Sequence, residues 1–126
     1  MDSSVWIDFF RRSPGAGGRE LRRMIQDAEP LALTGVVIAE ILQGLTRDAR
    51  AIERFLFQFD MLEPSGFETY RAAAAIFRAA RAKGISLTTI DTLIAAIAFE
   101  NNATVFTLDQ DFSRIELMTG LVLHRF

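Results

Sequence analysis

Four acidic residues, each beside an apolar segment, are the side chains best suited to chemistry in this chain. Asp91 lies in the first turn of the stretch 90–99, which has almost no polar face, and a helix apolar on all sides is normally buried. No basic residue lies within one helical turn of Asp91. An ionised carboxylate out of water is costly unless it is paired or binds a metal. The other three acids are Asp2, Glu40 and Asp109.

Short apolar segments alternating with helical patterns predict how these acids are arranged. We expect strands at residues 31–33, 61–63, 104–107 and 121–123. We expect helices at residues 5–10, 19–28, 36–45, 49–59, 66–83, 90–99 and 112–117, and a loop at 11–18. This order favours an α/β fold with a mostly parallel sheet covered by helices on both faces. Because sites in such sheets lie beyond the carboxyl ends of the strands, we expect the four acids to converge there.

Converging carboxylates point to divalent metal chemistry. Carboxylates within a few ångströms repel one another unless a cation intervenes. Oxygen ligands without histidine or cysteine suit Mg²⁺ or Mn²⁺, and such ions can activate water for attack on a phosphodiester. The chain has no cysteine and a lone His124, so a side-chain nucleophile is not evident. Metal-assisted phosphodiester hydrolysis is therefore the reaction that the sequence favours.

The composition bounds the setting of this chemistry. With 126 residues, half of them hydrophobic, we expect one domain over residues 1–126. The lack of cysteine favours a reducing compartment, the N-terminus is too short and acidic for a signal peptide, and no apolar run is long enough for a membrane span. We expect a cytoplasmic protein. The net charge of −2 is not typical of a nucleic-acid binder, but it turns positive if the four acids bind metal.

Four sequence blocks together resemble a known family. Residues 2–7, 39–44, 89–96 and 107–112 resemble the PIN-domain ribonucleases, and most closely the VapC-type toxins of bacterial and archaeal toxin–antitoxin pairs. The joint pattern covers essentially the whole chain. The resemblance implies a three-layer PIN fold with a short central sheet. It also implies a Mg²⁺- or Mn²⁺-dependent endoribonuclease acting on RNA, a homodimer, and a cognate VapB-like antitoxin.

The resemblance also implies roles for individual positions. Asp2, Glu40, Asp91 and Asp109 match the family's acidic quartet, and the auxiliary positions are Asp111, Ser4 and Thr107. Family members usually carry several apolar residues before the first acid, whereas only Met1 precedes it here. We therefore expect the native start to lie a few codons upstream.

Each residue also has a simpler interpretation. Asp91 could be a charge that favours a helix N-terminus, and Asp109 and Asp111 could be a turn and a helix cap. We expect Asp8 to be a solvated helix residue and His124 to be structural.

Several arginines are candidates for contacts with RNA phosphates. They are Arg11, Arg12, Arg47 and Arg114. For the first two, which belong to an arginine-rich segment, a solvated helix face is the alternative.

Two other functional classes compete with a nuclease. A non-catalytic module could use the same fold to bind a partner protein, although the complete acidic quartet argues against it. An aspartyl-phosphate enzyme also places acids at strand ends. It is disfavoured because Asp2 is followed by Ser3 and Ser4 rather than by a second acid.

Overall fold

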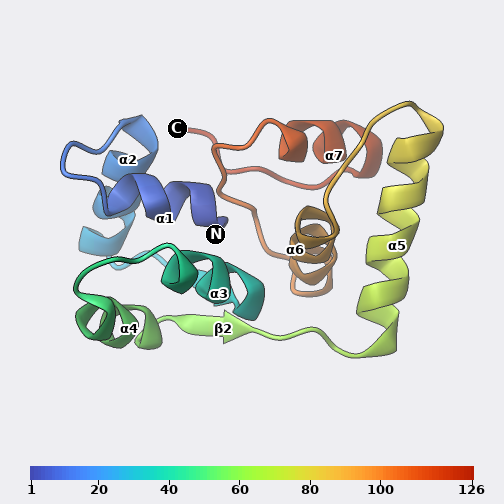
Figure 1. Ribbon diagram of the computed structural model, residues 1–126. Coiled ribbons are helices and arrows are strands. Elements are labelled where there is room, and N and C mark those ends of the chain that lie inside the picture. The colour runs from blue at the N-terminus through green and yellow to red at the C-terminus, as the bar shows by residue number, and fades with distance from the viewer. The chain divides into compact units, whose positions relative to one another are not determined.

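The elements of the chain fall into two units, one of residues 1–62 with Phe126 and one of residues 63–125. The structure, a computed structural model, describes residues 1–126. Figure 1 draws the first unit in blue to green and most of the second in yellow to red. No helix combines the length and apolar character that a membrane crossing needs.

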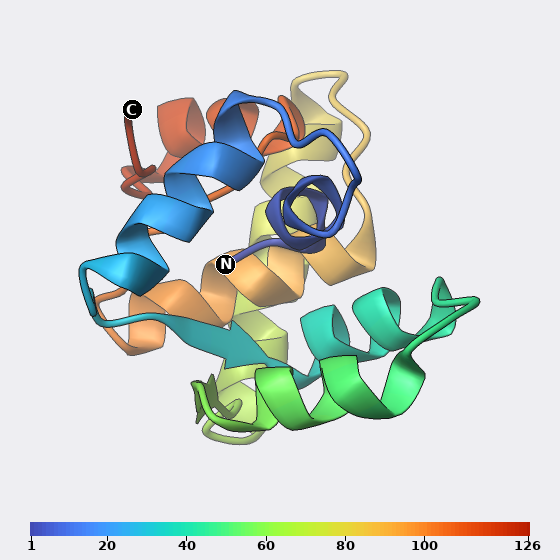
Figure 2. The same ribbon diagram turned by 90° about the vertical axis from the view of Figure 1, so that its left-hand side faces the viewer.

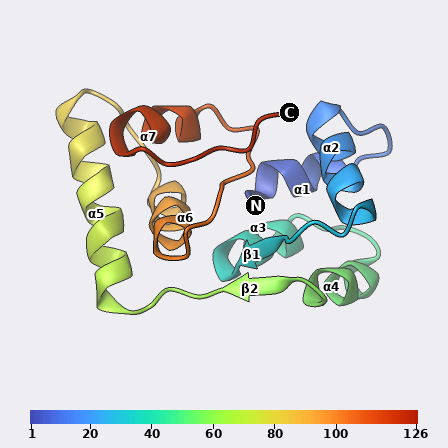
Figure 3. The same cartoon turned by 180° about the vertical axis from the view of Figure 1, so that it is seen from behind.

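The first unit is a pair of parallel strands with four helices. Its elements are α1 (Ser3–Phe9), α2 (Ala16–Gln26), β1 (Ala32–Thr34), α3 (Gly35–Gln43), α4 (Ala49–Phe57) and β2 (Asp60–Leu62). Ala32 pairs with Asp60 and Thr34 with Leu62, and Figure 3 shows the two strands side by side. The connection through α3 and α4, which run next to each other in Figure 2, lets two consecutive strands lie parallel.

Aromatic packing holds α1 in the first unit. Trp6 is fully buried, and its ring stacks or meets edge-on the rings of Phe9, Phe10, Phe55 and Phe59. The paired ring centroids of this cluster lie 5.1 to 6.2 Å apart, within the range in which aromatic pairs attract each other beyond simple burial. The helix that begins beside Asp2 is thereby anchored against α4.

The predicted loop at residues 11–18 is wrong at its end, because α2 already begins at Ala16. The expectation that Asp8 is solvated is also wrong, because Asp8 is only 6% exposed. The Asp8 carboxylate accepts hydrogen bonds from the backbone N–H of Gly15 at 3.0 Å and of Gly18 at 2.7 Å. These are N–H groups of a helix start, which otherwise lack partners. Asp8 therefore caps α2 from a different helix.

The glycines of this segment allow the close approach. A Cβ atom at Gly18 would lie 2.9 Å from the backbone carbonyl carbon of Asp8 and from the backbone nitrogen of Phe9. The two donated hydrogen bonds, that of Gly15 first, lower the pKa of Asp8. Local composition predicted a loop as far as residue 18, but with the cap from Asp8 the helix α2 already begins at Ala16.

The second unit contains three helices and one parallel bridge. They are α5 (Phe67–Ala82), α6 (Thr89–Glu100) and α7 (Asp111–Thr119). The strands expected at 104–107 and 121–123 reduce to an isolated parallel bridge between Val105 and Leu123. His124 donates its backbone N–H to the Val105 carbonyl at 2.8 Å, and its ring lies 4.8 Å from that of Phe106. His124 thus has the structural surroundings that we expected.

The end of α5 follows the sequence signal closely. Gly84 has a φ of +75°, a conformation that favours glycine. The N–H of Gly84 bonds to the Arg81 carbonyl, and the N–H of Ile85 bonds to the Ala80 carbonyl. This is the hydrogen-bond pattern of a Schellman motif, and it confirms the predicted helix end.

Candidate metal site

Asp91 is presented by the first turn of α6. Thr88 caps this helix, its side-chain oxygen accepting the backbone N–H of Asp91 at 3.1 Å, a position that hydroxyl residues favour. Residues 94–98 of the helix are buried, and Asp91 itself is only 8% exposed. The prediction that the apolar helix carries Asp91 into the interior is confirmed.

Asp109 and Asp111 are presented by a tight turn that leads from the Val105 bridge into α7. The Thr107 hydroxyl oxygen accepts the backbone N–H of Asp109 at 2.9 Å. In turn, a carboxylate oxygen of Asp109 accepts the backbone N–H of Asp111 at 2.9 Å. Each short polar side chain thus bonds to the backbone two residues further on, which is how such residues stabilise turns. Asp111 becomes the first residue of α7.

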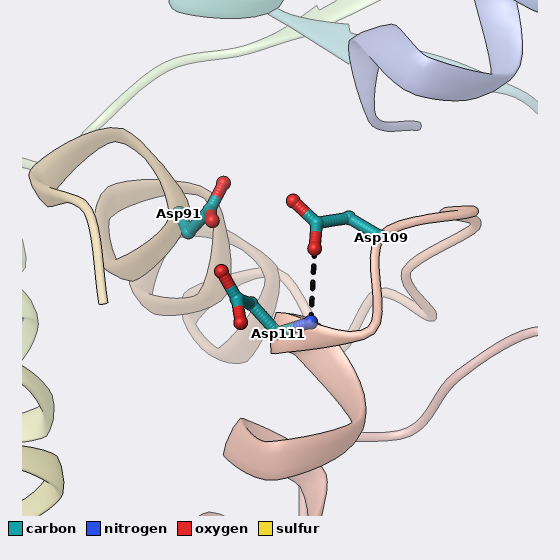
Figure 4. Close-up of side chains that lie close together, drawn as sticks. All are labelled: Asp91, Asp109 and Asp111. Atoms are coloured by element: carbon teal, nitrogen blue, oxygen red, sulfur yellow. Dashed lines mark hydrogen bonds between the residues drawn. The ribbon is translucent and has the colours of Figure 1, made fainter. Parts of the chain in front are cut away.

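The three aspartates come together in the second unit. One carboxylate oxygen from each of Asp91, Asp109 and Asp111 lies within 4.8 Å of the others. Figure 4 shows the side chains pointing toward one another from α6, the turn and the start of α7. Asp91 is buried, Asp111 is partly exposed and Asp109 is exposed. The cluster is therefore closed on the Asp91 side and open to solvent on the Asp109 side.

One basic side chain lies beside the cluster, on the Asp111 side. Arg114 places a guanidinium nitrogen 3.5 Å from a carboxylate oxygen of Asp111. Its side chain is 53% exposed, and exposed ion pairs contribute little. Three neighbouring carboxylates repel when ionised, and a cation among them removes that repulsion. Oxygen donors alone fit a hard cation such as Mg²⁺ or Mn²⁺, so the donor set fits the metal that the sequence predicted.

A second polar cluster fixes the far end of α6. Glu100 accepts hydrogen bonds from the hydroxyls of Thr69 and Ser65 and from the Ser65 backbone N–H. The Thr69 hydroxyl, the largest cause, and the Ser65 donors lower the pKa of Glu100. Thr69 is fully buried on α5. This link joins the start of α5 to the end of α6, the helix that carries Asp91.

Asp2 lies in the first unit. It occupies the N-cap position of α1, is 4% exposed and accepts the Ser4 hydroxyl at 2.7 Å. Ser4, an auxiliary position by the resemblance, thus bonds to the first acid. The Met1 ammonium donates to the Ala32 carbonyl of β1 at 3.1 Å. Burial lowers the pKa of that ammonium to about 6, and the charge of Asp2 opposes the shift.

Glu40 and three of the candidate arginines also lie in the first unit. Glu40 is partly exposed on α3 and lines a cavity together with Arg11. Arg11 and Arg12 are exposed at the end of α1, and Arg47 is exposed between α3 and α4. The convergence of Asp2 and Glu40 with the other acids remains a prediction.

Asp111 lies closer to the other acids than an auxiliary position would require. We predicted it as an auxiliary position, yet it stands in the cluster beside Asp91 and Asp109. The signal was the spacing Asp109-Gln110-Asp111, in which the first carboxylate can accept the N–H of the second aspartate. The alternative in which Asp111 caps the following helix is not what the structure shows, because the N-cap of α7 is Gln110 and Asp111 is the first residue of the helix.

Comparison with known proteins identifies the family. The family model described as PIN domain matches residues 1–117. The chain is a PIN domain. It is 34% identical over 125 residues to VapC ribonuclease Mb1587 of Mycobacterium bovis and to ribonuclease VapC11 of Mycobacterium tuberculosis. Each alignment covers 96% of this chain and 93% of the relative, so this PIN domain is a homologue of VapC ribonucleases along nearly its full length.

Solved structures show the same fold. The structure of VapBC2 from Rickettsia felis, bound to a DNA fragment from its promoter, contains a chain that matches with a TM-score of 0.77. The match has 20% identity and covers 99% of this chain and 96% of that one. FitAcB from Neisseria gonorrhoeae matches with a TM-score of 0.70 at 17% identity, over 98% and 94% of the two chains. The predicted α/β PIN fold with a small parallel sheet is confirmed.

Proposed function

We propose that this PIN domain is a Mg²⁺- or Mn²⁺-dependent endoribonuclease and the toxin component of a VapBC-type toxin–antitoxin pair. The observation that carries the proposal is the cluster of Asp91, Asp109 and Asp111, whose oxygen atoms approach within 4.8 Å of one another. Homology to proteins named VapC ribonucleases supports RNA as the substrate class. The structural neighbours include VapBC2, which supports a VapB-like antitoxin as partner.

The chain's own residues would hold the metal and position the substrate. Asp91, Asp109 and Asp111 supply the carboxylates, and the hydrogen bonds around the turn keep two of them in place without bound substrate. A bound divalent ion would supply Lewis-acid stabilisation of the phosphodiester and activation of water. Because the cluster opens to solvent at Asp109, an RNA strand can reach it there. Arg114, whose guanidinium lies 3.5 Å from Asp111, would contact an RNA phosphate beside the cluster.

We further propose that residues 1–126 act as one domain in which Asp2 and Glu40 serve with the three clustered aspartates. The family model runs through both units, from residue 1 to residue 117. Asp2 and Glu40 match the family's acidic positions by motif; Asp2 is the N-cap of α1, and Glu40 lies on α3, the helix that directly follows β1. A homodimer is the proposed assembly, as the resemblance implies.

Removal of one charge at the cluster tests the catalytic proposal. Asp91→Asn keeps the shape of the side chain and removes its negative charge, so metal affinity and transition-state stabilisation should both fall. Because metal-ion catalysis contributes several kcal/mol and each 1.36 kcal/mol is tenfold in rate, we expect cleavage to slow at least about a hundredfold. The measurements are Mn²⁺-dependent cleavage of structured RNAs and Mn²⁺ binding by electron paramagnetic resonance.

The matched control is Glu53→Gln, which removes one negative charge from an exposed position on α4. It should cleave RNA and bind Mn²⁺ as the unmodified protein does, and circular dichroism should show both variants folded. Full activity of Asp91→Asn, or cleavage unaffected by EDTA, would rule the metal nuclease out. No cleavage by the unmodified protein with Mn²⁺ would favour the non-catalytic binding module instead.

A further inference from the structure

A cavity in the first unit lies between α1 and α3. It has a volume of about 260 Å³, and the two helices that frame it pack against each other, as Figure 3 also shows. Two segments line it, each made of a helix and the residues that follow it. The α1 segment supplies Ile7, Phe10 and Arg11, and the α3 segment supplies Glu40, Ile41, Gly44 and Leu45.

The lining combines an apolar wall with a cation. Ile7 is 49% exposed although it is a large aliphatic residue, and Phe10 presents an aromatic ring. Arg11 stands beside them with a side chain that is 66% exposed. Its one ion pair, to Asp8 at 3.7 Å, is long, and both carboxylate oxygens of Asp8 already accept backbone N–H groups. Most of the guanidinium donors are therefore available to an anion.

The backbone conformation at residue 44 does not require a glycine. Its φ of −87° and ψ of −3° are right-handed helical values that any residue adopts. A Cβ atom there would meet nothing closer than the Ile41 carbonyl oxygen at 3.7 Å, which is ordinary contact. The fold would accept a side chain at Gly44, and that side chain would take up cavity space. The missing side chain keeps the cavity open.

We propose that this cavity holds the base of a nucleotide next to the cleaved bond, with Arg11 on the adjoining phosphate. The proposal rests on the proposed function, because it uses Glu40 as one of the acids that act at the scissile phosphate. A nucleotide adjoining that phosphate must lie beside Glu40, and Glu40 lines the cavity. A nucleotide has a flat apolar face and an anionic group, and the lining offers an apolar wall and a cation to match them.

The test fills the cavity and removes the base in turn. The cleavage site of the unmodified protein is mapped on a short RNA, and RNAs with an abasic ribose on either side of that bond are then prepared. For the unmodified protein, loss of the base on one side should lower kcat/KM about tenfold, the effect of losing one stacked base. Gly44→Leu should lower kcat/KM by a similar factor on the intact RNA and should lose little more on the abasic RNA.

The control and a second readout separate this proposal from the nuclease assignment. Gln43→Leu introduces a leucine one residue away, at an exposed position that does not line the cavity. This variant should behave as the unmodified protein does. The affinity of fluorescently labelled intact and abasic RNAs is also measured in an Asp91→Asn background, with and without Gly44→Leu. The same pattern is expected there, so the cavity is tested even if no RNA is cleaved.

Three results would overturn the proposal. Gly44→Leu could cleave and bind intact RNA as well as the unmodified protein does. Alternatively, removal of the base could lower kcat/KM of Gly44→Leu by the same factor as that of the unmodified protein, which would mean that the base binds elsewhere. Gly44→Leu could also leave RNA binding intact while weakening a complex with an antitoxin, which would assign the cavity to a peptide segment. Absence of cleavage with normal base-dependent binding would overturn only the nuclease proposal.

Discussion

Asp8→Ala is expected to destabilise the first unit strongly, although Asp8 belongs to no proposed catalytic set. Asp8 sits in α1 and accepts backbone N–H groups of Gly15 and Gly18 at 3.0 and 2.7 Å. Alanine would leave both donors without this acceptor, and the second hydrogen bond is buried. A helix start that loses its cap is weakened, and a buried donor that loses its partner costs further free energy.

The magnitude follows from the two hydrogen bonds. A hydrogen bond to a charged group contributes about 1.5 to 3 kcal/mol, so losing two near the lower value costs about 3 kcal/mol of unfolding free energy. The effect depends on pH because these bonds lower the pKa of Asp8 in the folded state. Its contribution is complete above the unfolded-state pKa of about 3.9. The contribution disappears as the pH falls through the lower folded-state pKa.

The assay is urea unfolding followed by fluorescence of Trp6, the single tryptophan, which is buried in the same helix as Asp8. The gap between the unmodified protein and Asp8→Ala should be about 3 kcal/mol at pH 7 and should shrink below about pH 4. The control is Asp27→Ala at the other end of α2, where an exposed ion pair to Arg23 is lost and the change should be below about 1 kcal/mol. A gap of under about 0.5 kcal/mol for Asp8→Ala, typical of plain surface substitutions, would refute the capping argument.

Two further predictions concern how the elements are joined. Gly18→Ala should cost about 1 to 3 kcal/mol, because its Cβ would lie 2.9 Å from the backbone of Asp8; Gly35→Ala, where a Cβ meets nothing within 4 Å, should be neutral or stabilising in the same urea unfolding experiment. Glu100→Gln should lower the melting temperature at pH 7, since the hydrogen bonds from the Thr69 hydroxyl and from Ser65 lower the pKa of Glu100. The difference should fade in thermal scans as the pH drops through the folded-state pKa, and a difference that persists at pH 2 would contradict this assignment.

The sequence predicted well those features that depend on neighbouring residues. The helix end at residue 83 and the burial of Asp91 each follow from local patterns and are confirmed, and the structure adds the local cap of Thr88 on α6. Helices α3 to α6 were predicted to within two residues at each end. Capping, glycine conformation and helical periodicity act over a few residues, so a single sequence is enough to recognise them.

The sequence predicted less well the features that depend on distant partners. The start of α2 depends on Asp8, which lies seven and ten residues before its two N–H donors. The strands expected at 104–107 and 121–123 came out as one bridge, because strand length depends on which segments pair and not on apolar content alone.

What the amino-acid sequence determined by itself was the set of acids, the alternation of helices and strands, and the family pattern. Only the tertiary structure decided that Asp111 joins Asp91 and Asp109 within 4.8 Å and that Asp8 is a buried cap. It also decided that an open cavity lies beside Glu40. The physical reason is that periodicity and capping are local, whereas the distance between two carboxylates depends on how α6 and the start of α7 pack.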